Sequence, residues 1–236
     1  RVDRRQRQMC IRDRYGIPFR QLFGSPSSAY LRLVPQVKLY HDLSSNGSAV
    51  LAMRLRVSPT RLIHPDDPAE DPSLNHRFFG GGSSTERGWS EQSLLISNDP
   101  ARNANTGGYS DLIGNFELRY APFQYAHEFT YLQKLLSPIR VVAFYDIGNV
   151  WDNAFWTGGL AMNNLAQTLG LGFRYNFFFG ALRIDCGFKL YDPSGRFDDQ
   201  GLAITPGTQG KWLFSQRVLL HNTHTFNWHF GIGQAF

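Results

Sequence analysis

The chain has 236 residues, of which 42% are hydrophobic and 14% aromatic, and a formal net charge of +5. No stretch approaches the roughly 18 consecutive apolar residues of a transmembrane helix. The positive charge is spread along the chain, whereas a nucleic-acid-binding protein clusters it, so no nucleic-acid partner is expected.

Residues 1–14, RVDRRQRQMCIRDR, share no pattern with the rest of the chain. They resemble a translated adaptor sequence at the end of an assembled gene fragment; the alternative is a basic disordered tail. We therefore expect the folded domain to span residues 15–236 and residues 1–14 not to pack against it. No signal peptide is visible, so we expect the true N-terminus of an exported protein to lie further upstream.

Beyond residue 14 the chain alternates between apolar residues and polar or small ones with a period of two, which predicts β-strands with two different faces. In chain order the alternating segments are 29–42, 48–58, 113–121, 139–151, 165–177, 181–191 and 225–236. These lengths suit tilted strands that cross a bilayer, which need roughly 9–11 residues.

The last segment shows the pattern clearly. One parity is bulky and apolar and ends on an aromatic residue: Phe226, Trp228, Phe230, Ile232 and Phe236. The other parity is small or polar: Asn227, His229, Gly231, Gly233 and Ala235. Lipid outside and a wet lumen inside would produce this difference. The alternative is a soluble β-sandwich, but its strands are usually shorter, about 5–6 residues.

The connections provide an independent test. Residues 44–47 and 178–180 are short turns, and the long connections are 59–111, 152–164 and 192–224. Membrane barrels place short turns on the periplasmic side and long loops outside. Counting back from a periplasmic C-terminus, every long connection falls outside, and only 122–138 is longer than a periplasmic turn should be.

The predicted fold is all-β: a C-terminal fragment of a transmembrane antiparallel β-barrel with about seven strands. An ordinary outer-membrane barrel has about eight strands or more, and lipid does not tolerate open sheet edges. We therefore expect the first strands, and any periplasmic domains, to lie upstream of this sequence.

The connection 59–111 contains the segment RFFGGGSSTERGW at 77–89. Its candidate functional residues are Gly80, Gly81, Gly82, Arg87, Gly88 and Trp89. Taken alone it could be a flexible exposed loop, because glycine and serine let the backbone turn tightly. In its context it resembles the signature of the sixth extracellular loop of the BamA/TamA superfamily of outer-membrane assembly factors. Downstream, 115–120, 144–151, 181–185 and 230–236 resemble successive later strands of that family, so the resemblance covers roughly residues 29–236.

The resemblance implies that the loop folds back into the barrel lumen, where its arginine contacts acidic residues of the inner wall. Here Arg87 is the loop cation, and the strand alternation independently places Glu117 and Asp146 on the inner face. We expect Arg87 to pair with these two acids. The alternative is that the acids pair with other inner-wall cations: Arg119, Arg183 or Lys189.

The resemblance also implies a function in the bacterial outer membrane. It indicates a protein assembly, insertion or translocation factor that acts through a labile seam between the first and last strands of the barrel. Expected partners are the outer-membrane lipid bilayer, unfolded outer-membrane protein substrates, and periplasmic or lipoprotein partners. Residues 225–236 would be the seam strand, where Gly231 and Gly233 lack side chains that lock the pairing; alternatively they make room for a plug. The expected C-terminal assembly signal is Trp228, Phe230, Ile232 and Phe236.

Two other classes of membrane protein remain open. A two-partner secretion transporter shares the loop signature, and a passive porin would not need it. An enzyme is not expected, because His64, Asp66 and Asp67 have no nucleophile motif nearby. Cys10 and Cys186 lack CxxC or His-ligand spacing, so no metal, cofactor or disulfide is expected.

Overall fold

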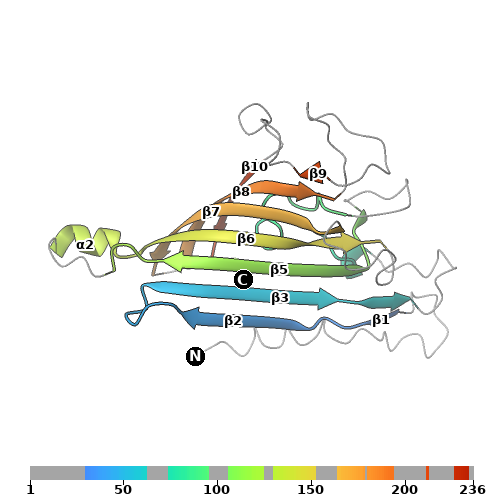
Figure 1. Cartoon of the computed structure of the whole chain (residues 1–236), viewed down its shortest axis with the longest axis horizontal. Coiled ribbons are helices and arrows are strands. Elements are labelled where there is room, and N and C mark those ends of the chain that lie inside the picture. The colour runs from blue at the N-terminus through green and yellow to red at the C-terminus, as the bar shows by residue number, and fades with distance from the viewer. Residues whose placement is uncertain are drawn as a thin grey trace.

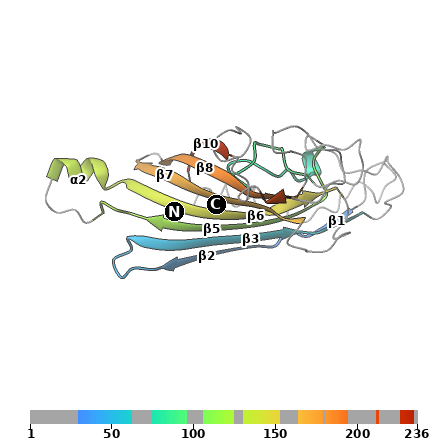
Figure 2. The ribbon, with the colours of Figure 1, turned by 45° about the horizontal axis from the view of Figure 1, so that its top comes forward.

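The computed structural model describes residues 30–62, 74–95, 106–124, 130–152, 164–178, 180–193, 211–212 and 226–233. The main body is a single curved sheet, with loop residues 74–95 folded against one of its faces (Figures 1 and 2). Residues 1–14, for which we expect no packing, lie outside the described ranges.

The sheet contains the seven strands that the alternation predicts. They are β2 (Gln36–Asp42), β3 (Ala49–Ser58), β5 (Ser110–Tyr120), β6 (Ile139–Trp151), β7 (Ala166–Phe177), β8 (Gly180–Asp192) and β10 (Phe226–Ile232). Each pairs antiparallel with the next in this order, and the short β9 (Lys211–Trp212) also pairs with β8. The prediction of consecutive antiparallel strands in one sheet is therefore confirmed. Within the described residues, β2 and β10 are the two edges.

The first predicted strand, 29–42, is interrupted. Its beginning, β1 (Tyr30–Arg32), pairs with β4 (Thr60–Leu62), and β2 pairs with β3 in the same register. Pro35 and Pro59 lie at the break, and proline has no backbone N–H to donate to the ladder. Their carbonyls still accept hydrogen bonds, from Val57 at 3.2 Å and from Leu33 at 3.1 Å. The interruption therefore does not shift the strand.

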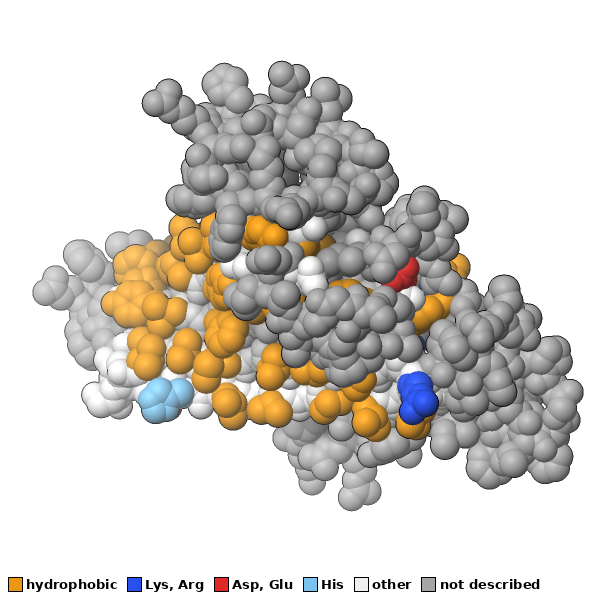
Figure 3. All heavy atoms as spheres, turned by 45° about the vertical axis from the view of Figure 1, so that its right-hand side comes forward, with side chains coloured by type: hydrophobic (Ala, Val, Ile, Leu, Met, Phe, Trp, Pro, Cys, Tyr) orange, Lys and Arg blue, Asp and Glu red, His pale blue; other side chains and the backbone are white. Residues whose placement is uncertain are grey.

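The two faces of the sheet differ as the alternation predicts. On β7 the side chain of Leu171 is 61% exposed, whereas that of Arg174 is 1% exposed. Large hydrophobic side chains are spread over the outer face, and the few charged groups in view lie towards its margins (Figure 3). The polar side chains are buried on the inner face, where the loop packs. The described core is therefore mostly polar, unlike that of a soluble sandwich.

Two of the connections contain described helical turns. The 122–138 connection contains a helix, α2 (Thr130–Leu136), which extends beyond the strand ends (Figure 1). This helix was not predicted; its leucines, glutamine and lysine favour helix, and Pro138 prevents its continuation. A 3₁₀ turn, η3 (Leu74–His76), opens the described part of the long loop. No helix among the described residues is long and apolar enough to span a membrane.

Candidate functional site

Glycine-rich turns shape the loop 74–95 into a narrow projection. Gly81 and Gly82 have φ angles of 87° and 105°, a region that residues with a Cβ rarely adopt. The Gly82 amide donates to the carbonyls of Glu86 and Trp89, at 3.2 and 3.0 Å. Residues 86–89, which we call the tip, are thereby turned towards the inner face of the sheet. The side chain of Trp89 is only 3% exposed and packs against Leu94.

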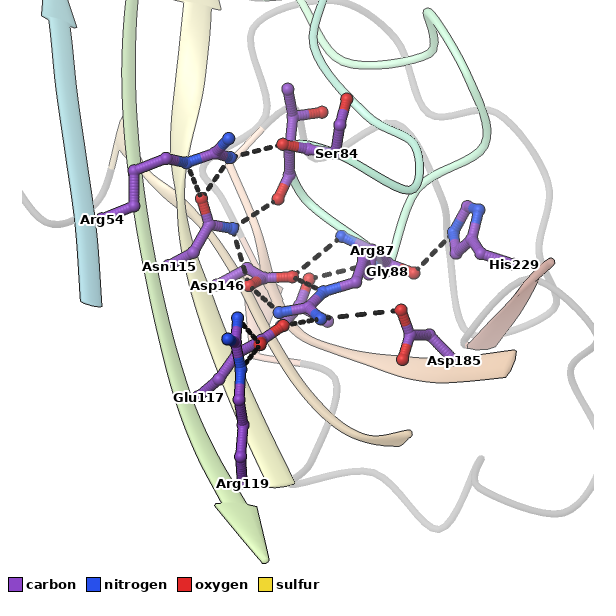
Figure 4. Close-up of polar contacts among 12 residues, drawn as sticks. Arg54, Ser84, Arg87, Gly88, Asn115, Glu117, Arg119, Asp146, Asp185 and His229 are labelled. Carbon is purple, nitrogen blue, oxygen red and sulfur yellow. Dashed lines mark hydrogen bonds and ion pairs between the residues drawn. The ribbon is translucent and has the colours of Figure 1, made fainter. Parts of the chain in front are cut away.

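The Arg87 side chain lies between the two predicted acids (Figure 4). Its Nε and Nη2 donate to the two oxygens of Asp146, at 2.8 and 2.7 Å, in a bidentate pair. Its Nη1 donates to Glu117 at 2.5 Å. All three side chains are almost completely buried, so the pair is held in a confined site where opposite charges interact strongly.

Glu117 is shared among several cations, whereas Asp146 is not. Arg119 donates to Glu117 at 2.8 Å, and Arg174 lies 3.8 Å from it. The described ion pairs of Asp146 are with Arg87 alone. Glu117 therefore contacts both the loop arginine and inner-wall cations, whereas the described ion pairs of Asp146 are with the loop arginine.

A third acid, Asp185 on β8, completes the charge cluster. Its Oδ2 lies 3.6 Å from Nη1 of Arg87, and its other oxygen accepts from Arg174. Arg183, an alternative partner for the acids, lies 3.5 Å from Asp185. Because the alternation also places Asp185 inside, its parity could have identified it. Its distance from the tip could not be judged from sequence.

Asn115 on β5 connects the cluster to the loop backbone. Its amide donates to the Thr85 carbonyl and to Asp146, both at 2.7 Å, and its oxygen accepts from Nε of Arg54 at 2.9 Å. Arg54 in turn donates to the Ser84 carbonyl. Strands β3 and β5 therefore hold the loop backbone at Ser84 and Thr85, just before the tip.

The inner wall leaves room for the tip at β7 and β8. The guanidinium of Arg87 lies 3.5 Å from the ring centroid of Phe144, an arrangement that favours cation–π attraction. Phe144 pairs across the strands with Gly170, where a Cβ would overlap its ring. At Gly187 a Cβ would overlap the carbonyl of Arg87 itself. The tip can approach the inner face of β7 and β8 closely because Gly170 and Gly187 have no side chains.

The two charged residues of the tip, Glu86 and Arg87, are compensated for their burial to different extents. Burial lowers the pKa of Arg87, but the carboxylates of Asp146, Glu117 and Asp185 outweigh burial and raise it. Arg87 is therefore always charged. Glu86 is buried with little compensation: burial raises its pKa to about 7, although the Gly81 amide that donates to it acts in the other direction.

Comparison with known proteins identifies the family. The Omp85 superfamily domain matches residues 16–236. The chain belongs to the Omp85 superfamily. In fold it is similar to the crystal structure of BamA from Haemophilus ducreyi lacking POTRA domains 1–3, with a TM-score of 0.51 and 16% identity. The match covers 78% of this chain and 34% of that one, so this chain spans about a third of the length of that protein. No curated protein matches the sequence.

Several residues of this Omp85 domain were not among the predicted site residues. Phe144 had a usable signal, because it is the one aromatic residue on the inner parity of β6. Thr168 and Gly187 had none, since their importance depends on where the tip lies. The hydroxyl of Thr168 accepts the Gly88 amide at 3.2 Å.

Among the remaining predicted residues of the Omp85 domain, those of the expected assembly signal on β10 face away from the tip, whereas Lys189 contacts it. Trp228, Phe230 and Ile232 face outwards and are 57%, 72% and 73% exposed. Lys189 lies over the ring of Trp89, 5.0 Å from its centroid, and Cys186 is a half-buried free thiol. The residues that fall outside the described ranges are Cys10, His64, Asp66, Asp67 and Phe236.

Proposed function

We propose that this chain is the C-terminal barrel portion of a bacterial outer-membrane protein that assembles or inserts other outer-membrane proteins, as BamA- and TamA-like factors do. Membership of the Omp85 superfamily and the barrel-like sheet support this proposal. The outer face, rich in exposed hydrophobic side chains, would contact the lipid bilayer.

The docked tip is the observation that carries the proposal. Arg87, Asp146 and Glu117 form a buried cluster that ties one long loop to the inner wall. A passive pore has no need to secure a loop in this way. An insertion factor does need it, because one seam of its barrel must open while the rest of the wall remains in place.

The proposed mechanism is strand templating. β10 is an edge of the described sheet, so its outer backbone groups are available to pair with an incoming strand. Its end is weakly constrained, since Gly231 and Gly233 contribute no side chain to cross-strand packing. Unfolded outer-membrane proteins would be the substrates, and periplasmic or lipoprotein partners would deliver them.

A reconstitution experiment tests the proposal. The full-length protein is placed in liposomes, and the folding rate of an unfolded outer-membrane barrel protein is followed by its altered gel mobility. We expect the wild type to accelerate folding and Arg87→Ala to lose most of that acceleration. Arg61→Ala is the matched control, because Arg61 is an exposed arginine on β4 whose removal should leave the rate unchanged.

The range of substrates separates the proposed function from a secretion transporter. An assembly factor should accelerate several unrelated barrel proteins, whereas a two-partner transporter should export one cognate protein and accelerate none. Folding no faster than in empty liposomes for every substrate tried would therefore contradict the proposed function.

A further inference from the structure

The tip of the loop is also bound by two side chains of β10, of which His229 is shown in Figure 4. The Nε2 of His229 lies 2.9 Å from the carbonyl oxygen of Arg87. Because a carbonyl can only accept, this nitrogen carries the hydrogen and donates it. Asn227 donates its amide to the Gly88 carbonyl and accepts from the Ser90 hydroxyl at 3.3 Å.

These contacts are built into the inner face of the sheet. Asn227 and His229 are two residues apart, so they share the inward parity of β10, and His229 is only 8% exposed. Asn227 pairs across the strands with Gly187, the β8 position where a Cβ would overlap the Arg87 carbonyl. The missing side chain at Gly187 therefore opens the space through which the tip reaches β10.

β10 gains from these contacts a support that its backbone lacks. In the described sheet β10 has one main neighbour, β8, paired from Phe226 to Ile232, whereas β3 to β8 lie between two neighbours. The tip supplies a second attachment. Arg87 connects β10 to the strands across the cluster. Its main-chain carbonyl binds β10, and its guanidinium binds β5 and β6.

We propose that Asn227 and His229 are positioning residues that latch β10 to the tip of the loop. Docking of the tip and alignment of β10 on β8 then change together. With the tip docked, β10 is held from two directions; with the tip released, only the β8 pairing remains. The consequence for seam opening rests on the proposed function, but the latch itself does not.

Hydrogen exchange of the full-length protein in lipid nanodiscs tests the latch. Asn227→Asp keeps the side-chain shape but removes the donor to Gly88, and His229→Ala removes the donor to Arg87. Each should speed amide exchange in 226–233 by about 2–10-fold, the range expected for one lost hydrogen bond. Exchange in 50–57 of β3, which does not pair with β10, should change much less. His229→Gln, which retains an N–H donor, should restore part of the protection.

A variant that never touches β10 tests the coupling. Asp146→Asn weakens the anchor of the tip on β6, and the latch predicts faster exchange in 226–233 as well. Asn176→Asp is the matched control: it is an exposed inner-parity asparagine on β7, eight residues from Thr168 and thus about 26 Å along the strand. It should leave 226–233 unchanged.

Any of three results would overturn the latch. The first is unchanged amide exchange in 226–233 for both Asn227→Asp and His229→Ala. The second is an undocked tip in Asp146→Asn with no change of exchange in β10, and the third is a uniform increase of exchange over β3 to β8 in the β10 variants. Exchange does not depend on insertion activity. A latched wild type that fails to accelerate substrate folding would contradict the proposed function alone, and an active wild type whose variants exchange normally would contradict the latch alone.

Discussion

Arg87 binds Asp146 through its main chain and its side chain together. The Arg87 backbone amide donates to Oδ2 at 3.1 Å, and the guanidinium donates to both carboxylate oxygens. One carboxylate therefore fixes both the position of the loop backbone and the direction of the arginine. Since Glu117 binds only one end of the guanidinium and has other cationic partners, the two acids are not equivalent.

The first prediction concerns this difference between the two acids. Asp146→Asn should weaken docking of the tip more than Glu117→Gln, because Asp146 receives three hydrogen bonds from Arg87. Breaking a buried ion pair by neutralising one partner costs about 3–5 kcal/mol, and Glu117 shares its charge with Arg119. Protease accessibility of the loop in the full-length protein measures docking. Equal accessibility in the two variants would contradict the ranking.

Arginine itself should be difficult to replace. Arg87→Lys should restore only part of the docking lost in Arg87→Ala, because an ammonium cannot donate to both oxygens of Asp146 as a planar fork does. It would also lose much of the contact with the ring of Phe144. The same accessibility measurement applies, and full recovery with lysine would show that charge alone holds the tip.

Gly187 provides a test that changes no charge. Gly187→Ala would place a methyl group on the main-chain carbonyl of Arg87, and backbone atoms cannot move aside without displacing the tip. We expect the barrel to fold and the tip to be undocked. Gly231→Ala is the matched control on the same inner face, since its Cβ would lie 3.0 Å from the far end of the Arg183 side chain and its nearest contacts would include no backbone atom of the tip. Undocking by Gly231→Ala to the same extent would argue against a specific close approach.

The sheet could be predicted from the sequence because its two environments differ so strongly. A strand with lipid on one side and a polar interior on the other must alternate, so the period of two gives both the strand and the facing of Glu117 and Asp146. The break at Pro35 and the helix α2 were missed for a local reason. The strands were predicted from the alternation alone. Pro35 interrupts that alternation, and the leucines of α2 do not follow it.

The contacts of the tip could be predicted only in part. The facing of Asp146 can be read from its own strand, but the contacts of Gly187 and His229 depend on how far a loop some 100–140 residues away reaches across the wall. Alternation cannot provide that distance. The Phe144–Gly170 pair is intermediate, because a large residue opposite a glycine signals close packing across two strands.

Phe236, the last residue of the expected assembly signal, leads to a prediction about assembly rather than stability. Phe236→Ser should lower the amount of protein inserted in cells far more than it lowers the stability of protein already folded. Burial of one aromatic side chain contributes only about 1.5–3 kcal/mol, whereas the insertion machinery would read the aromatic residues of the expected assembly signal in the unfolded chain. Membrane yield and the urea midpoint of the folded protein measure the two effects. An unchanged yield in cells would remove the assembly-signal interpretation.

Glu86 should make docking of the tip depend on pH. Burial raises the pKa of Glu86 to about 7 in the docked loop, with Asp146 and Asp111 adding to the effect against the Gly81 amide and Arg56. In an undocked, solvated loop the carboxyl would have its ordinary pKa of about 4.3. The docked state therefore binds the proton more tightly, so docking is strongest below about pH 4.5, weakens as the pH rises to about 7, and is constant above that.

The difference between the docked and undocked pKa of Glu86 sets the size of the pH effect on docking. A pKa of about 7 in the docked loop against about 4.3 in the undocked loop corresponds to roughly 3–4 kcal/mol of docking free energy lost between acid and neutral pH. Glu86→Gln keeps the size of the side chain but cannot ionise, so its docking should not vary over pH 5–8.5 and should exceed that of the wild type at pH 8. Protease accessibility of the loop in wild type and variant at each pH gives the comparison, and it cancels the pH dependence of the protease. Because Glu91 binds the Ser83 amide at an exposed position of the same loop, Glu91→Gln should retain the pH dependence of the wild type. Parallel curves for wild type and Glu86→Gln would show that another group titrates.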